Sequence, residues 1–323
     1  MSPSAHEVDE PCARVRGRLR HLDAVPLPGS GHTWSRWQSL AELGRKDLSL
    51  TRIAEGHVDA RAILIELDRS DLLVAGQLLG VWAADPEDLH AARTHDGWRL
   101  QGAKRWCSGS MRLDRALVTV TADDGPRLFC IDPRVADAEP GSWEPMGMVS
   151  TASHRLTFDD VAVPVDAAIG APGAYVARPG FGHGGCGVAA CWWGGALGVV
   201  DELRRAVIVG APDDTAAALG RSVADLTGAG HGLRAAARAI DDDPHDLDLA
   251  VRLAAEVRLV VEQAARTALD RTVAALGASG LCQMPSHSQR VADLTVYLSQ
   301  LPRFRAEASF GRLTAGRNLG IPW

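Results

Sequence analysis

Hydrophobic positions change their spacing twice along the chain and divide it into three stretches. Between Trp34 and Leu67 apolar residues recur at intervals of three and four, which predicts two or more helices. From about residue 78 to Pro164 they alternate with polar residues or form short runs between Gly, Pro and Asp, as in WRLQG, ALVTV, RLFCID and HRLTFDDVAVP. Helical spacing returns after Pro164. The pattern therefore predicts helices, then a β-domain, then helices.

The two helical stretches differ in their connections. A single helix is expected around Pro11 to Leu22, before the helices that begin near Trp34. After Pro164 a linker rich in Gly, Ala and Pro leads into a helix of mostly small residues, ACWWGGALGVVDELRRAVI, and small residues let another segment approach the backbone closely. Three more helices are expected over 215–240, 244–276 and 289–317, which together suggest an antiparallel four-helix bundle.

We therefore expect an α+β multidomain protein. Its predicted parts are a short N-terminal helical domain over 1–75, a middle antiparallel β-barrel or sandwich over 76–172, and a C-terminal helical bundle over 173–323.

Composition and charge exclude several function classes. The 323 residues are 46% hydrophobic and 23% charged, and a formal net charge of −6 gives no electrostatic basis for a nucleic-acid partner. No apolar run approaches the roughly 20 residues that cross a bilayer, and the start, MSPSAHEVDEPCARVR, lacks a secretory apolar core. The six cysteines show no CxxC spacing, so neither a disulfide framework nor a metal site is indicated. These features favour a cytoplasmic enzyme with no membrane partner.

Three segments carry a family resemblance. They are GWRLQGAKRWCSGSMRLDRALVTV from Gly97, MGMVSTASHRLTFDDVAVPVDAAIG from Met146, and TVAALGASGL followed by QRVADLTVYLSQ. Together they resemble the acyl-CoA dehydrogenase family, in nearly the whole length of the chain and in the same order. The resemblance implies an N-terminal helical domain, a middle β-domain and a four-helix bundle, with FAD held between the β-domain and the bundle.

The resemblance also implies which residues meet the cofactor, FAD in preference to FMN. Trp106 would pack by the isoalloxazine ring, and Ser108 would form a hydrogen bond near its N5 and O4 atoms. Gly277 and Gly280 would lie where a neighbouring subunit's backbone meets the cofactor. From the residues alone, a core tryptophan is the favoured interpretation of Trp106. Ser108 is then a turn hydroxyl, and the two glycines form a helix C-cap turn, which is compatible with the same geometry.

The first predicted strand departs from the family pattern. A Thr-Glu-Pro and a glycine-rich acidic turn are expected there, whereas the chain reads LLGVWAADPEDLH. Trp82 or Ala84, with Asp85 and Pro86, would occupy the cofactor-binding position. The N-terminal helical domain is also short.

A larger departure concerns the base that removes the α-proton of the acyl thioester. Alignment places Leu301 where most members carry the catalytic glutamate, and Val188 where a minority carry it. Abstraction of a weakly acidic proton needs a positioned base with a tuned pKa. His183, in the linker, is one candidate substitute; Cys186 and Cys191 are weaker ones. Glu256 and Glu262 are equally explained by ion pairs with Arg252, Arg258 or Arg266.

Three functions remain open at this point. The first is a FAD-dependent oxidoreductase that acts on an acyl substrate, for example a CoA thioester, with an unrecognised base. The second is a flavin monooxygenase or hydroxylase on the same fold, which needs no glutamate. The third is a non-catalytic subunit that pairs with a homologous chain. The family resemblance implies a homo-oligomer, or a hetero-oligomer with such a chain.

Overall fold

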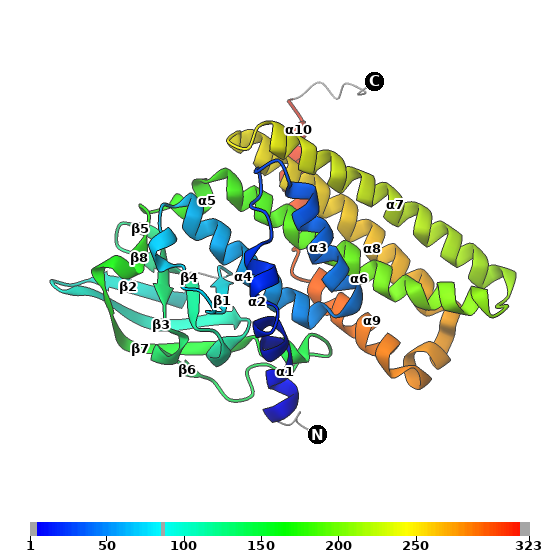
Figure 1. The fold of residues 1–323 in the computed structure, drawn as a ribbon, viewed down its shortest axis with the longest axis horizontal. Coiled ribbons are helices and arrows are strands. Elements are labelled where there is room, and N and C mark those ends of the chain that lie inside the picture. Colours follow the sequence, from blue (N-terminus) through cyan, green and yellow to red (C-terminus); the bar gives the residue numbers. More distant parts are fainter. Residues whose placement is uncertain (1–4, 85–87, 317–323) are drawn as a thin grey trace. The chain divides into compact units, whose positions relative to one another are not determined.

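This computed structural model describes residues 5–84 and 88–316, which form helices and a mixed β-sheet (Figure 1). The chain forms two compact units. We call Met1–Val25 with Ser49–Gly180 the sheet unit, and Pro26–Leu48 with Phe181–Trp323 the helical unit. Within the described residues, no helix is both long and apolar enough to cross a membrane.

Four helices precede the sheet in the described part of the chain. They are α1 (Ala5–Arg16), α2 (Leu19–Asp23), α3 (Thr33–Lys46) and α4 (Leu48–Glu66). Helices α3 and α4 confirm the prediction of at least two helices between Trp34 and Leu67. The single helix predicted around Pro11 to Leu22 is wrong, because the helical hydrogen bonds stop near Gly17 and a separate short helix follows.

The sheet contains eight strands within the described ranges. They are β1 (Leu79–Trp82), β2 (Leu89–Arg93), β3 (Gly97–Cys107), β4 (Arg115–Ala122), β5 (Gly125–Ile131), β6 (Asp137–Ala138), β7 (His154–Pro164) and β8 (Ala168–Ile169). Their order is β6-β7-β3-β2-β4-β5-β8, with β1 also paired to β4. The expected β-module is therefore present.

The prediction of a purely antiparallel barrel or sandwich is wrong in two respects. Strands β1 and β2 both pair with β4 in parallel, β1 along 115–118 and β2 at Thr121 and Ala122. In addition, the end strands β6 and β8 have no described pairing with each other, so the sheet stays open. The alternating pattern indicates strands but carries no information on their relative direction.

Helix α4 packs on one face of the sheet. Its residues Ala60, Ile63 and Leu64 form a buried cluster with Leu79 of β1, Leu117 of β4, Leu128 and Cys130 of β5, and Ile169 of β8. Burial of such apolar side chains contributes roughly 25 cal/mol per Å² removed from water. The cluster fixes β1, which carries Trp82, and β4, which follows the first of the two loops described below.

The helical unit contains α3 and five later helices within the described chain. The later ones are α6 (Pro179–Ile208), α7 (Asp213–Asp242), α8 (Leu247–Gln283), α9 (Pro285–Leu298) and α10 (Arg303–Thr314); the short α5 (Ala174–Ala177) precedes them in the sheet unit. The helix predicted over 289–317 is divided by a turn at 299–302, and residue 317 lies outside the described residues. Gly277 interrupts α8 with φ of 59°.

The linker predicted to contain His183 is helical instead, because α6 already begins at Pro179. The glycines of α6 have a low helix propensity, but their lack of a side chain lets neighbouring helices approach the backbone closely. A Cβ at Gly182 would lie 2.5 Å from the Ala250 carbonyl oxygen, and one at Gly194 would lie 2.1 Å from that of Ala41. Packing against α8 and α3 therefore stabilises a helix that propensity alone disfavours.

Replacement of Gly194 tests this contact. Gly194→Ala should destabilise the protein by about 2 kcal/mol or more, because the added methyl group meets backbone that cannot move aside easily. Gly228→Ala on α7 is the matched control: nothing lies within 4 Å of the added Cβ, so the change should stabilise by about 0.5–1 kcal/mol. Thermal unfolding of both variants measures the difference. Equal midpoints would contradict the close α3–α6 contact.

A charged cluster is buried on α4 of the sheet unit. Glu55 is buried, hydrogen-bonded by Arg52, and adjacent to Asp59. Burial raises the pKa of Glu55 to about 8, Arg52 opposes this rise, and the negative charge of Asp59 adds to it. Glu55 is therefore largely protonated at neutral pH, unlike an exposed glutamate.

The raised pKa predicts a pH-dependent stability. Between about pH 4.3, the unfolded value, and pH 8 the folded protein holds a proton on Glu55 that the unfolded chain has lost. The free energy of unfolding should therefore fall as pH rises through this window. Urea unfolding from pH 5 to 8.5 should show a steeper fall for the wild type and for Glu256→Gln, an exposed control, than for Glu55→Gln. Parallel curves for all three proteins would refute the shift.

Candidate functional site

Two loops of the sheet unit carry most of its unusual backbone. We call residues 106–110 the Trp106 loop and residues 148–153 the Met148 loop. Of the six described non-glycine residues with positive φ, four lie here: Trp106 (62°), Ser110 (24°), Met148 (59°) and Ala152 (44°). Such conformations cost about 1–3 kcal/mol each and concentrate at functional sites. Their clustering therefore marks these loops as the candidate site.

Hydrogen bonds join the two loops to each other. The Gly109 amide donates to the Thr151 carbonyl at 2.8 Å, and the Ser110 hydroxyl donates to the Ala152 carbonyl at 2.5 Å. Trp82 of β1 also supports the Trp106 loop, because its indole Nε1 donates to the Ser108 carbonyl at 3.0 Å. Each loop thus holds the other in its strained conformation.

The Trp106 side chain is held at the surface of the structure rather than in the core. It is 52% exposed, and its ring meets that of Trp143 edge to face at a centroid distance of 6.0 Å and 84°. Trp143 is itself fixed by Nε1 hydrogen bonds to the Met148 and Val149 carbonyls. The reading of Trp106 as a core tryptophan is therefore wrong. The role of Trp143 could not be predicted from the sequence, because it meets Trp106 only in the folded structure.

A chain of hydroxyl groups runs beside Trp106. Ser108 Oγ lies 2.8 Å from Ser153 Oγ, which lies 2.8 Å from Thr151 Oγ1, and Thr151 donates to the Met148 carbonyl at 2.8 Å. Each hydroxyl has a single proton. Because Thr151 gives its proton to the carbonyl, Ser153 must donate to Thr151, and Ser108 must donate to Ser153. The Ser108 oxygen is therefore left as an acceptor.

The site offers a flat apolar face and one acceptor, which suits a planar conjugated ring with an N–H group. Trp106 and Ser108, both identified from sequence, lie in the same loop. Thr151 and Ser153 were missed, although the run STAS before a strand was a visible signal. Trp106, Ser108 and Trp143 are the residues that could hold a cofactor ring in this unit.

The other predicted cofactor residues of the first strand lie differently. Trp82 is 1% exposed, so it supports the Trp106 loop from the core and offers no open ring face. Ala84 is exposed just after β1. Asp85 and Pro86, named with it, lie outside the described residues.

Gly277 and Gly280 belong to the helical unit. Gly277 is exposed, and its φ of 59° breaks α8, as a glycine turn requires. Gly280 is buried, and a Cβ there would lie 2.8 Å from the Leu276 Cβ and 3.5 Å from His287 Cδ2. Local packing thus accounts for Gly280 without a ligand.

The structure places no carboxylate at the two expected base positions. Leu301 is buried just after α9, and Val188 lies on α6. His183 is buried on α6, so it is not a solvated loop histidine. Burial raises the pKa of Cys186 to about 12, partly offset by Arg258, so this thiol stays protonated. Glu55 is the carboxyl group whose pKa is raised strongly among the residues that the structure describes, and it was missed by sequence. Its signal was a glutamate among Ile53, Ala54 and Val58.

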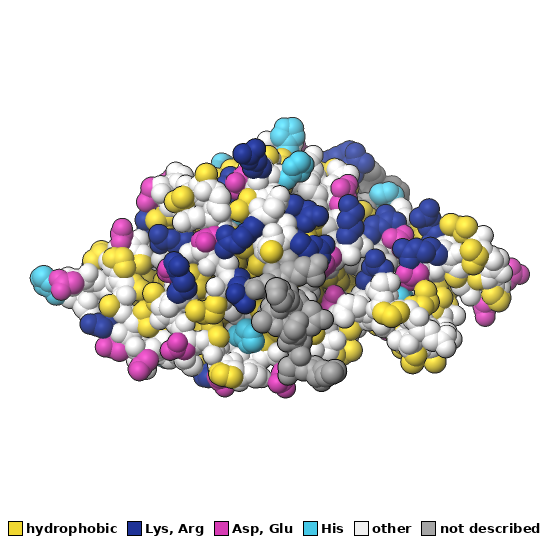
Figure 2. Space-filling model, turned by 60° about the horizontal axis from the view of Figure 1, so that its bottom comes forward, with side chains coloured by type: hydrophobic (Ala, Val, Ile, Leu, Met, Phe, Trp, Pro, Cys, Tyr) yellow, Lys and Arg dark blue, Asp and Glu magenta, His cyan; other side chains and the backbone are white. Residues whose placement is uncertain are grey.

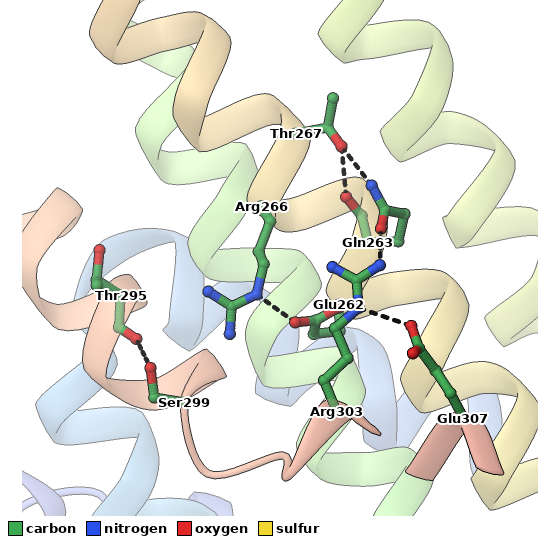
Figure 3. A network of polar contacts seen from close by, with 8 residues as sticks. All are labelled: Glu262, Gln263, Arg266, Thr267, Thr295, Ser299, Arg303 and Glu307. Carbon is green, nitrogen blue, oxygen red and sulfur yellow. Dashed lines mark hydrogen bonds and ion pairs between the residues drawn. The ribbon is translucent and has the colours of Figure 1, made fainter. Parts of the chain in front are cut away.

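The two glutamates considered on α8 are ion-paired. Glu256 lies 3.7 Å from Arg252, and the buried Glu262 accepts a hydrogen bond from Arg266 (Figure 3). Arg303 approaches Glu262 at 3.9 Å and also binds Glu307 at 2.8 Å. These contacts support the structural interpretation of both glutamates. Of the three arginines named as possible partners, Arg258 takes no part.

An open cleft of about 830 Å³ lies between α7, α8 and α10. Its lining includes Leu259, Val260, Asp225, Arg271, Arg303 and Glu307. The charges of this lining neutralise each other, since Arg271 binds Asp225 at 2.6 Å and Arg303 binds Glu307. The four charged side chains named in this lining are thus paired with each other.

Comparisons with known proteins add the fold relationship. No protein-family description and no curated protein matches the sequence significantly. Among solved structures, the dibenzothiophene monooxygenase TdsC from Paenibacillus sp. A11-2 is 19% identical, with 97% of each chain covered and a TM-score of 0.76. XiaF from Streptomyces sp., solved with FADH2 and glycerol, is 16% identical, with 98% of this chain and 92% of that chain covered and a TM-score of 0.78.

Butyryl-CoA dehydrogenase from Megasphaera elsdenii is similar to the same degree, at 16% identity, with 95% of this chain and 94% of that chain covered and a TM-score of 0.75. Monooxygenases and a dehydrogenase thus match equally well, so the fold alone does not separate the two reactions. The resemblance seen in the sequence is confirmed at the level of fold: this chain has the acyl-CoA dehydrogenase fold.

Proposed function

We propose that this protein is a flavin-dependent oxidoreductase that works as a monooxygenase rather than as an acyl-CoA dehydrogenase. The observation that carries the choice is the absence of a carboxylate at both base positions, Leu301 and Val188. Dehydrogenation of a thioester requires that base. A reduced flavin instead activates molecular oxygen and needs no protein carboxylate for that step.

The Trp106 loop supports a reduced cofactor. Oxidised flavin presents acceptors at N5 and O4, whereas reduced flavin carries a proton on N5. Because Ser108 Oγ has already given its proton to Ser153, it can accept from that N5–H but cannot donate to an oxidised ring. In this proposal Trp106 binds the ring face, and Ser108 orients it and favours its reduced form.

We propose FAD as the flavin, as the sequence resemblance implies. The neighbours support a flavin of either kind, since TdsC has been solved with FMN and XiaF with FADH2. The substrate belongs to the wide range that flavin oxygenases accept. We also propose an oligomer, following the sequence resemblance, and the finer architecture of a four-helix bundle.

The decisive experiment compares redox states. Under anaerobic conditions, purified protein should bind reduced FAD at least about tenfold more tightly than oxidised FAD, because one good hydrogen bond to the ring is gained, about 1.4 kcal/mol. Oxygen added to the reduced complex should then be consumed. Bleaching of bound oxidised flavin by acyl-CoA would instead indicate a dehydrogenase. No affinity for FAD or FMN in either state would overturn both flavin functions.

Trp106→Ala should weaken flavin binding by about 1–3 kcal/mol, because a stacked aromatic surface is removed. Fluorescence titration of the reduced and oxidised flavin measures the loss. Phe304→Ala, which removes an 83% exposed ring from α10, serves as the control and should bind as the wild type does. Unchanged binding by a folded Trp106→Ala variant would show that this ring is not a cofactor wall.

A further inference from the structure

Basic side chains, Lys and Arg together, are numerous on the face shown in Figure 2, and acidic side chains lie among them. In the helical unit most have acidic partners: Arg45 with Asp201, Arg205 with Glu202, Arg252 with Glu256, Arg266 with Glu262, and Arg271 with Asp225. Arg258 on α8 is different. Across residues 5–84 and 88–316 it forms neither a hydrogen bond nor an ion pair, and its Nε is buried without an acceptor.

The surroundings of Arg258 are aromatic and close to α6. Its guanidinium carbon lies 5.4 Å from the centroid of the Trp192 ring, a cation–π distance. Its Cδ would lie 3.6 Å from a Cβ at Gly185, so the side chain runs along the glycine-rich part of α6. Tyr297 of α9 meets Trp192 edge to face at 6.2 Å. Three helices therefore surround one unpaired cation.

A second donor in the same cluster also lacks an acceptor. The Trp192 side chain is completely buried, and its indole Nε1 has no hydrogen-bond partner within the described chain. An unsatisfied buried donor costs about 1–3 kcal/mol, and an unpaired charge costs more. The two donors lie beside each other and are both unsatisfied within the described residues, so a bound acceptor would complete the cluster.

The charge of Arg258 persists despite its burial. Burial lowers the pKa of its guanidinium, and Cys186 and Tyr297 partly offset this effect. A guanidinium nevertheless remains protonated in proteins at neutral pH. The guanidinium of Arg258 is therefore a positive charge that a ligand in this cluster would neutralise.

We propose that Arg258 binds the carboxylate of a small-molecule ligand, with the Trp192 ring beside it as an apolar wall. A carboxylate matches the planar fork of a guanidinium with two parallel hydrogen bonds and carries the single charge that is needed. A phosphate monoester would bring nearly two charges against one cation. As a substrate site, this assignment rests on the proposed flavin oxygenase and narrows its substrates to carboxylic acids.

Calorimetric titration of the full chain with benzoate and hexanoate tests the proposal. At least one should bind the wild type, and Arg258→Gln should bind it about 10- to 100-fold more weakly, since hydrogen bonds to charged groups contribute about 1.5–3 kcal/mol. Arg252→Gln on the same helix removes an arginine that already has an acidic partner and should bind as the wild type does. Arg258→Lys keeps the charge without the fork and should be weakened several-fold, which preserves the test if the Gln variant does not fold.

Neutral and dianionic probes complete the design. Benzamide has the shape of benzoate without its charge and should not bind; phenyl phosphate should bind more weakly than benzoate. The proposal is overturned if neither carboxylate binds, if Arg258→Gln or Arg258→Lys binds as the wild type does, if Arg252→Gln also loses binding, or if either other probe equals benzoate. These titrations need no flavin. A protein that binds benzoate through Arg258 but takes no flavin would thus overturn the proposed function and keep the anion site.

Discussion

The hydroxyl chain that ends at the Met148 carbonyl is the constraint on which the candidate site depends. It joins Ser108, Ser153 and Thr151 at successive distances of 2.8 Å and lies between two loops that each hold residues with positive φ. Because the carbonyl can only accept, it sets the direction of every proton in the chain. A detail of geometry thereby becomes a chemical property: the Ser108 hydroxyl donates its one proton to Ser153, so towards any other group it can only accept.

Hydrogen bonds from neighbouring residues hold the strained backbone of the two loops around the hydroxyl chain in place. Trp106 would relax if the loop were free, because a left-handed conformation is unfavourable for a bulky residue. The hydrogen bond from Trp82 and the links from Gly109 and Ser110 to the Met148 loop prevent this relaxation. Beneath them, the α4 cluster on the sheet keeps β1 and β4 in place. The core of the sheet unit thus holds a large ring at the surface.

Sequence reasoning predicts the elements well and their arrangement less well. The period of apolar positions predicts α3, α4 and the strands, because burial on one face leaves a direct mark on spacing. It fails at Pro179–Gly187, where contacts with α3 and α8 stabilise a glycine-rich helix that local propensity disfavours. It also misses the parallel pairing of β1 and β2 with β4, since strand direction depends on connections and not on alternation.

In the candidate site, too, the sequence predicts the residues of one local motif but not those that reach the site only through folding. Trp106 and Ser108 were identified because a motif places them two residues apart, whereas Trp143 and Ser153 come from another segment and reach the loop only through folding. The environments of Glu55 and Arg258 could not be predicted from the sequence for a related reason. A charged residue on a helix is usually solvated or paired, and only its surroundings reveal that Glu55 is buried or that Arg258 lacks an acid.

Two features of the helical unit bear on which ligand it could bind. Acidic side chains are missing at Leu301 and Val188, where proton abstraction would need them, and donors without acceptors remain at Arg258 and Trp192. None of these four positions supplies a carboxylate, whereas Arg258 can neutralise a negative charge on a ligand. The proposed monooxygenase reaction and the proposed carboxylate site are compatible with these two features, since the first needs no carboxylate at Leu301 or Val188 and the second uses the unpaired Arg258.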